Sequence, residues 1–378
     1  MKQRILWGDA LRTIATILVV LIHVIAPYQY ATFNNHDKLG FLSLATINSI
    51  TRMAVPAFFM LTGAFLLNKT PSRTITKSSY LKWIKKTTVR LIIPFIIFST
   101  IGYIYSRLSN NLQPTFSNFM ANLFNYPGVQ YHMWFMYSII LIYLFIPFLQ
   151  KFISSLRRNE LKILVVVIFL CGNLLKTINL ISNNYDKTLF SGISIPDLMI
   201  YINYLLIGYY LSKYRISKKW YNIILITGIV SIIALPLTML FMNTAESADS
   251  LSSVTQLYPF FIGIAGFVSI KRYCENHSFS KRTHAIITRF SSISFYVYMI
   301  HVVILDAIQR YHPVNTTSLA RYISLIIAQS LITLLISTVI AIVFNLIYTR
   351  SLSLLNTIRR QLTKNLQPSQ AEDTISAN

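Results

Sequence analysis

Hydrophobic residues gather in ten blocks along the chain, and short polar segments separate them. The blocks cover residues 5–27, 46–67, 90–108, 131–150, 161–181, 196–212, 221–242, 256–272, 290–309 and 321–348. An α-helix needs about 17–25 apolar residues to cross a hydrocarbon core of ~30 Å, and most of the blocks have about that length. The pattern therefore predicts an all-α, polytopic membrane helical bundle of about ten transmembrane helices.

Composition agrees with a membrane protein. Hydrophobic residues make up 54% of the 378 residues and charged residues only 12%, whereas soluble domains carry about 25% charged residues. The first block is not a cleavable signal peptide, because it is long, is interrupted by Arg12 and lacks a small-residue cleavage site. We therefore expect a multi-pass protein of the cell membrane, with the lipid bilayer as a partner.

The net charge of +23 is distributed in short clusters between the hydrophobic blocks. This distribution argues against nucleic acid as a partner. With the N-terminus inside, most of the 34 lysines and arginines fall on one side of the membrane. The positive-inside rule then predicts that both termini are cytoplasmic, which requires an even number of spans.

Residues 1–350 are predicted to form one membrane domain, and residues 351–378 a cytoplasmic C-terminal tail. The polar end of the tail is predicted to be partly disordered. Cys171 and Cys274 fall in a predicted span and a predicted cytoplasmic loop, so we expect neither a disulfide nor a metal site from them.

The first hydrophobic block carries a polar stripe. Arg12 and His23 lie about 20° apart around a helix and about 16 Å apart along it, and Asp9 precedes Arg12 by one turn. An Arg or Asp at mid-membrane costs at least ~2.5–3.5 kcal/mol, so such residues tend to mark functional sites. A structural alternative stays open: Arg12 extends to the interface, Asp9 neutralises it and His23 is a core histidine.

Other polar residues lie in or beside later blocks. Arg52 is predicted a turn or two inside the second span, at about the depth of His23, where it would line a site or anchor the helix at the interface. His132 begins the fourth span on the outer side, and His301 lies in the middle of the ninth. Asp197 begins the sixth span, where we expect it to cap the helix.

A basic cluster precedes and opens the third span on the predicted cytoplasmic side. It comprises Lys82, Lys85, Lys86 and Arg90. These cations suit an anionic ligand, although ordinary topology charges remain the alternative for most of them. Arg90 differs because it stands at the mouth of the span, four residues before Pro94.

Five segments, taken in order, carry a resemblance to a known family. They are GDALRTIATILVVLIHVIA (8–26), RMAVPAFFMLTGAFLL (52–67), VRLIIPF (89–95), HMWFMYSIILIYLFIPFL (132–149) and SISFYVYMIH (292–301). Together they resemble the acyltransferase-3 family of integral-membrane acyltransferases, in which an Arg preceded by an Asp is followed by ten residues and a His. Asp9, Arg12 and His23 match that pattern in order and spacing.

The resemblance is greatest to the shorter, single-domain branch, which includes the O-acetyltransferase of enterobacterial common antigen. Two positions depart from the family pattern. Thr87 stands where the family often has an Arg before the third span, and Val302 stands where a Pro often follows the late His. The first departure bears on contacts to the donor phosphates, not on the class of enzyme.

The resemblance implies an O-acyltransferase, most often an O-acetyltransferase, of the bacterial cytoplasmic membrane. Cytoplasmic acyl-CoA, most often acetyl-CoA, would be a co-substrate with no tightly bound cofactor and no metal. The acceptor would be a hydroxyl of a cell-surface or lipid-linked glycan. The predicted catalytic residues are His23, Arg12 and Asp9; the donor-binding residues Arg90, Lys86 and Lys85; and the acceptor-binding residues Arg52, His132, Trp134 and His301.

Acyl transfer to an alcohol requires a base for the hydroxyl proton and donors for the developing oxyanion. An imidazole, with an ordinary pKa near 6.5, suits the first role, and a permanently charged guanidinium suits an oxyanion or a phosphate.

The alternative function is export or translocation of a polysaccharide or lipid-linked sugar, for which the 23 tyrosines could line a path. The compact Arg–His stripe favours the enzyme, and binding of acetyl-CoA would discriminate between the two functions. The chain carries no P-loop, dinucleotide-binding fingerprint, serine-nucleophile elbow or HExxH motif, which argues against several enzyme classes and ATP-driven transport.

Overall fold

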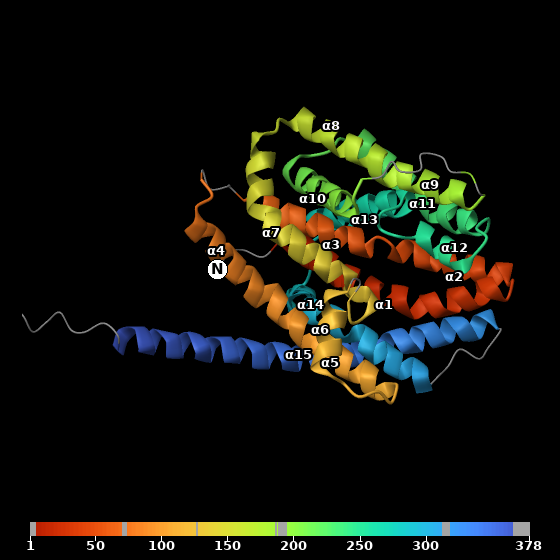
Figure 1. The fold of residues 1–378 in the computed structure, drawn as a ribbon. Helices are drawn as coiled ribbons and strands as arrows, with labels where there is room; N and C mark the ends of the chain where they lie inside the picture. Colours follow the sequence, from red (N-terminus) through yellow and green to blue (C-terminus); the bar gives the residue numbers. More distant parts are fainter. Residues whose placement is uncertain are drawn as a thin grey trace, which may run out of the picture.

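The computed structural model describes residues 5–69, 74–125, 128–185, 187, 195–311 and 318–365. Within these residues the chain is helical apart from turns and short connections, and no strand is present. Figure 1 shows long helices that run roughly side by side, with short helices at the ends of the bundle. The predicted all-α membrane bundle is confirmed.

The helical elements follow one another without any other regular structure. They are α1 (Leu6–Asn34), α2 (Lys38–Thr51), α3 (Ala54–Thr62), η1 (Gly63–Leu67), α4 (Lys77–Thr87), η2 (Thr88–Ile92), α5 (Ile93–Ser109), α6 (Phe116–Phe124), η3 (Tyr131–Met133), α7 (Trp134–Ser155), α8 (Arg158–Phe169), η4 (Leu170–Leu174), α9 (Leu175–Asn183), α10 (Asp197–Lys213), α11 (Lys218–Met239), α12 (Ala245–Leu251), α13 (Leu257–Asn276), α14 (Lys281–Tyr311) and α15 (Leu319–Asn365).

Eight helical segments of the described chain are long and apolar enough to cross a membrane. They are Leu6–Asn34, Lys38–Leu67, Lys77–Ser109, Tyr131–Ser155, Arg158–Asn183, Lys218–Met239, Lys281–Tyr311 and Leu319–Ile358. Each contains or largely overlaps one of the predicted spans. The remaining two predicted spans are the helices α10, which is only 17 residues long, and α13, whose C-terminal part carries Lys271, Arg272 and Glu275. The count of ten spans and the cytoplasmic termini remain predictions.

The second span differs from its prediction, because its helix begins at Lys38 and breaks at Arg52. The break has a local cause. Pro56 has no N–H to donate to the carbonyl of Arg52, and the regular bonds of α3 begin with Ala57, which donates to the carbonyl of Met53. Arg52 therefore stands at the junction of α2 and α3 and not inside a continuous helix.

α1 lies near the centre of the bundle and packs against α2, α3, α13, α14 and α15. α10 packs against α3 and η1 so closely that two glycines are required. A Cβ added to Gly208 would lie 2.0 Å from the carbonyl oxygen of Met60, and one added to Gly63 would lie 1.9 Å from that of Leu205. Small residues allow this backbone contact between membrane helices.

α15 lies at the edge of the bundle, and its last turns extend away from the other helices (Figure 1). Leu331 and Leu335 are exposed on it, as expected for a helix that faces lipid. The first residues of the predicted C-terminal tail, 351–365, continue this helix. Residues 366–378 lie outside the described residues.

Candidate active site

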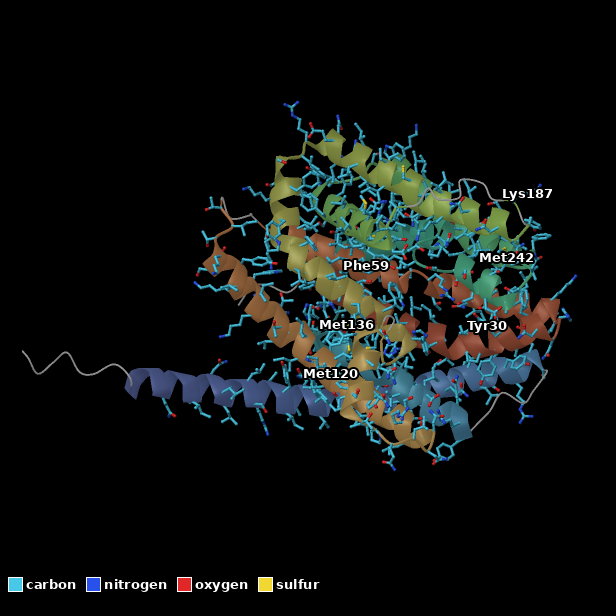
Figure 2. All side chains as sticks on the ribbon, in the orientation of Figure 1. Tyr30, Phe59, Met120, Met136, Lys187 and Met242 are labelled. Carbon is cyan, nitrogen blue, oxygen red and sulfur yellow. The ribbon has the colours of Figure 1, made fainter. Side chains whose placement is uncertain are left out.

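A pocket of about 730 Å³ opens between α1, the α2–α3 junction, the start of α7, α10, α12 and α14. We call the end of the bundle where α1 begins the inner end and the opposite one the outer end, after the predicted topology. The pocket lies towards the outer end, because its lining on α1 runs from Val19 to Tyr30. Figure 2 shows Tyr30 at the same end of the bundle as Met242.

Three histidines from three separate segments meet at this pocket. The ring centroids of His23 and His301 are 5.2 Å apart, those of His132 and His301 5.0 Å, and those of His23 and His132 6.2 Å. His23 and His132 line the pocket, whereas His301 is fully buried behind them. The structure thus brings together three of the residues that the sequence singled out.

Hydrogen bonds fix the orientation of two members of the cluster. Nδ1 of His301 lies 2.6 Å from the carbonyl oxygen of Tyr298. Because a carbonyl can only accept, Nδ1 carries the hydrogen in the neutral ring, and Nε2 is left as an acceptor. Nε2 is buried and has no hydrogen-bond partner among the described residues. The hydroxyl of Tyr298 donates to the backbone carbonyl of His132 at 2.6 Å, which links α14 to the start of α7.

Arg52 lines the same pocket and pairs with an acid that the sequence analysis did not select. Its Nη2 lies 3.1 Å from Oδ1 of Asp249 on α12, and its side chain is 13% exposed against 39% for Asp249. Nε of Arg52 is buried and has no partner among the described residues. The guanidinium also lies within electrostatic range of His23. Arg52 is therefore anchored on one side and has a donor left for a ligand.

Aromatic rings and hydroxyl groups complete the pocket wall. Trp134 lies 5.7 Å from Tyr201 between ring centroids, and Tyr131 lies 5.1 Å from His23. Further lining residues are Tyr30, Phe135, Ser250, Ser252, Ser253 and Gln309. Such a mixture of rings and a few polar groups is typical of a small-molecule site.

Asp197 does not cap α10 as predicted, because Pro196 occupies the cap position. Its carboxylate instead forms an ion pair with Lys176 of α9, and it lines the pocket. This pair holds α9 and α10 together at the outer end. The sequence could not reveal it, since it depends on which helices are neighbours.

The other two predicted catalytic residues lie outside this pocket, at the inner end of α1. Oδ1 of Asp9 accepts from the hydroxyl of Ser291 at 2.6 Å and lies 3.7 Å from Nη1 of Arg12. Nη1 of Arg12 donates to the same hydroxyl at 3.2 Å. Asp9 is buried, and the cluster joins α1 to α14. The predicted trio is thus divided, because His23 lies about 16 Å further along the axis of α1 than Arg12.

The predicted donor-binding residues lie at the inner end as well. Lys85 and Lys86 are exposed on the last turn of α4, and Arg90 is exposed in η2. η2 is a π-helical turn, an irregularity that is frequent at functional sites. Arg90 and Arg12 both lie within electrostatic range of the hydroxyl of Tyr143 on α7. Two guanidinium groups from α1 and η2 therefore face the same part of the inner end.

A family model described as an acyltransferase domain matches residues 5–349, nearly the whole chain. The chain belongs to the acyltransferase-3 family. No curated protein and no solved structure matches it, so the likeness to the enterobacterial common antigen enzyme stays a prediction. Family membership and the apolar helices together identify a multi-pass membrane acyltransferase.

The spacing pattern described in the sequence analysis includes Arg12, which lies in the inner cluster, and His23, which lies in the outer pocket. Among the described residues, no group of three or more His, Cys, Asp or Glu side chains is arranged to hold a metal ion.

Proposed function

We propose that this acyltransferase moves an acetyl group from cytoplasmic acetyl-CoA to a hydroxyl of a cell-surface or lipid-linked glycan. The histidine cluster beside Arg52, in a pocket near the outer end, carries this proposal. It supplies a base and a cation next to a space of about 730 Å³ that an acceptor can enter.

In the proposed reaction, Nε2 or Nδ1 of His23 accepts the proton of the acceptor hydroxyl. The hydroxyl oxygen forms a bond to the acetyl carbonyl carbon, and the carbonyl becomes an oxyanion. Arg52 stabilises this charge through its spare donor. The carbon–sulfur bond then breaks, and the coenzyme A thiolate takes up a proton, which leaves an acetyl ester and free coenzyme A.

The cations at the inner end support an anionic acyl donor. Coenzyme A carries several phosphate charges, and Arg12, Arg90, Lys85 and Lys86 present cations on that side. Guanidinium groups bind phosphate oxygens through directed, charge-assisted hydrogen bonds. In this proposal Arg12 contacts the donor and not the oxyanion, because Arg52 stands nearer to His23.

The outer pocket supports a sugar as the acceptor. Flat rings such as those of Tyr131, Trp134 and Tyr201 can pack on the apolar face of a sugar, while the serines of the 250–253 segment can hydrogen-bond its hydroxyls. Asp249 and Asp197 add acceptors for hydroxyl donors at the rim.

The test is transfer from radiolabelled acetyl-CoA to glycans in membranes that contain the purified, reconstituted protein. We expect acceptor-dependent release of coenzyme A and label in the glycan fraction. A protein that moved glycan across the vesicle membrane without binding acetyl-CoA would instead be an exporter, and that result would overturn the proposal.

A further inference from the structure

A second cavity, of about 780 Å³, lies at the opposite end of α10 from the histidine pocket. α10 begins at the outer pocket with Asp197 and ends at this second cavity with Lys213. The ends of α10 and α13 and the start of α11 enclose it. Its charged lining residues are Lys213, Arg215, Lys218, Lys271, Arg272 and Glu275. We call it the inner basic pocket. Five cations therefore face one carboxylate.

The cations are held in place mainly by neutral groups. Nζ of Lys271 donates to the carbonyl oxygen of Leu211 at 2.7 Å and lies 3.7 Å from Glu275. Nζ of Lys213 donates to the hydroxyl of Tyr209 at 2.6 Å. These partners orient the ammonium groups, but only Glu275 cancels any charge.

Aromatic rings, which are also neutral, hold Arg272 and Lys213 in place. Its guanidinium carbon lies 4.1 Å from the ring centroid of Tyr221, and Nζ of Lys213 lies 5.6 Å from that of Tyr214. Cation–π contacts stabilise a cation without neutralising it. The pocket is thus ordered while its positive charge stays available.

Ordinary topology charges do not account for this arrangement. Lysines and arginines that only fix the topology need no cavity and can extend freely into water. The side chain of Lys271, in contrast, is only 19% exposed, and its neighbours repel it. The other four cations are exposed around it. A partly buried cation among like charges is costly unless an anion joins them. The arrangement therefore points to an anionic ligand.

The position of the pocket relative to the membrane surface narrows the choice of ligand further. Trp220 lies on the first turn of α11, between the pocket residues Lys218 and Tyr221, and its side chain is 60% exposed. An exposed Trp at a helix end is typical of the headgroup level of a bilayer. Basic pockets between helices on this side of the membrane bind phosphate-bearing head groups.

We propose that the inner basic pocket binds the phosphate group of a ligand at the inner membrane surface. Two sources carry that chemistry, an anionic phospholipid and the nucleotide part of coenzyme A. The proposal does not depend on the reaction assigned to the outer pocket.

The experiment compares purified full-length variants in detergent, with phosphatidylglycerol, phosphatidylcholine and coenzyme A as separate probes. The test variant is the double substitution Lys213→Gln and Arg272→Gln. The control, Lys281→Gln and Arg282→Gln, removes two exposed cations at the start of α14, outside the pocket. Affinities are measured by native mass spectrometry for the lipids and by equilibrium dialysis for coenzyme A.

We expect the test variant to bind one anionic probe about 10- to 30-fold more weakly than the control, given about 1 kcal/mol for each cation near the surface. Loss for phosphatidylglycerol alone identifies a lipid, and loss for coenzyme A identifies the nucleotide. Arg272→Lys should retain most of the affinity, which separates charge from folding. Equal binding of both anionic probes by test and control variants would overturn the proposal. Since no transfer is measured, failure here leaves the reaction at the outer pocket untouched.

Discussion

The imidazole rings of His23 and His301 lie 5.2 Å apart between centroids and are inclined by 34°. One ring belongs to α1 and the other to α14, two helices that pack along each other. Nε2 of His301 has no hydrogen-bond partner among the described residues, which makes the buried ring a hydrogen-bond acceptor behind the half-buried ring of His23. An acceptor in that position can hold His23, or a water beside it, in one orientation.

Replacing His23 by Gln is expected to lower acyl transfer by about 10²–10⁴-fold, because a general base contributes about that much. Gln preserves side-chain volume and some hydrogen bonding, so the fold and donor binding should survive. The measurement is glycan acetylation in cells that lack the wild-type copy, at matched protein levels.

The matched control for this variant is His284→Gln, since His284 is exposed near the inner end of α14. It should transfer acetyl groups at the wild-type rate. Near-normal acetylation by the His23→Gln variant would show that His23 has a structural role and is not the general base.

Gly208→Ala is expected to destabilise the protein by about 1–3 kcal/mol, the usual cost of overpacking. The new Cβ would meet backbone atoms of Met60, which cannot move without shifting α3. Thermal unfolding in detergent measures the effect. Gly266→Ala is the control, because its Cβ would meet only the side chain of Met53, whose Sδ and Cε lie 2.7 Å away on a flexible chain. Equal losses would show that backbone contact at Gly208 is not limiting.

Hydrophobic blocks identified the helices well, because lipid demands long apolar segments whatever their neighbours. The same blocks placed several helix ends too early or too late. The third helix begins at Lys77 and not at residue 90, since polar residues can continue a helix beyond the membrane. The short helices α6 and α12 were missed for another reason. α6 has only nine residues, and α12 is both short and polar, so neither forms a long hydrophobic block.

The candidate site was only partly accessible from the sequence. His23, His132 and His301 were selected because ionisable side chains in membrane spans are rare, and their common pocket required the fold. Asp249 carried no such signal, since it belongs to a polar stretch between two hydrophobic blocks, where acids are ordinary. Grouping Asp9 and Arg12 with His23 relied on a shared helical stripe, and two residues on one stripe can lie about 16 Å apart along the helix and contact different neighbours.

Reporter fusions test the predicted topology. Fusions at positions 75, 155, 216 and 280 should report the cytoplasm, and fusions at 35, 120, 248 and 315 should report the outside. The reason is the clustering of lysines and arginines in alternate loops. A C-terminus located outside would contradict the ten-span arrangement and would exchange the inner and outer ends.

Arg90→Ala is expected to weaken binding of acetyl-CoA about 10- to 100-fold, because a hydrogen bond to a charged group contributes about 1.5–3 kcal/mol. Equilibrium dialysis against radiolabelled acetyl-CoA measures this at low and high salt, and wild-type affinity should fall as salt rises. Arg282→Ala, which removes an exposed cation at the start of α14, should bind normally. If the Arg90→Ala variant bound acetyl-CoA with wild-type affinity, Arg90 would be a residue that only fixes the topology.

The ion pair between Arg52 and Asp249 allows a double-mutant cycle. Asp249→Ala leaves a mostly buried guanidinium without the carboxylate that lies 3.1 Å from it. We expect a loss of about 1.5–3 kcal/mol in the free energy of unfolding, at the lower end because Asp249 is 39% exposed. In the double Ala variant the loss should be smaller than the sum of the single losses, since one buried charge is no longer stranded.

Measurements of kcat and KM distinguish the role of Arg52 from that of Asp249. If Arg52 stabilises the oxyanion, Arg52→Lys should lower kcat and kcat/KM together, because Lys lacks the planar fork and reaches a different position. Asp249→Asn should lower kcat less, since Asn can still accept a hydrogen bond from Arg52 and hold it in place. Non-additive losses of stability, with kcat unchanged in the Arg52→Lys variant, would show that the pair only ties α12 to the α2–α3 junction. The oxyanion would then have to be stabilised by another donor of the pocket, and Tyr131, whose ring lies 5.1 Å from that of His23 between centroids, is a candidate.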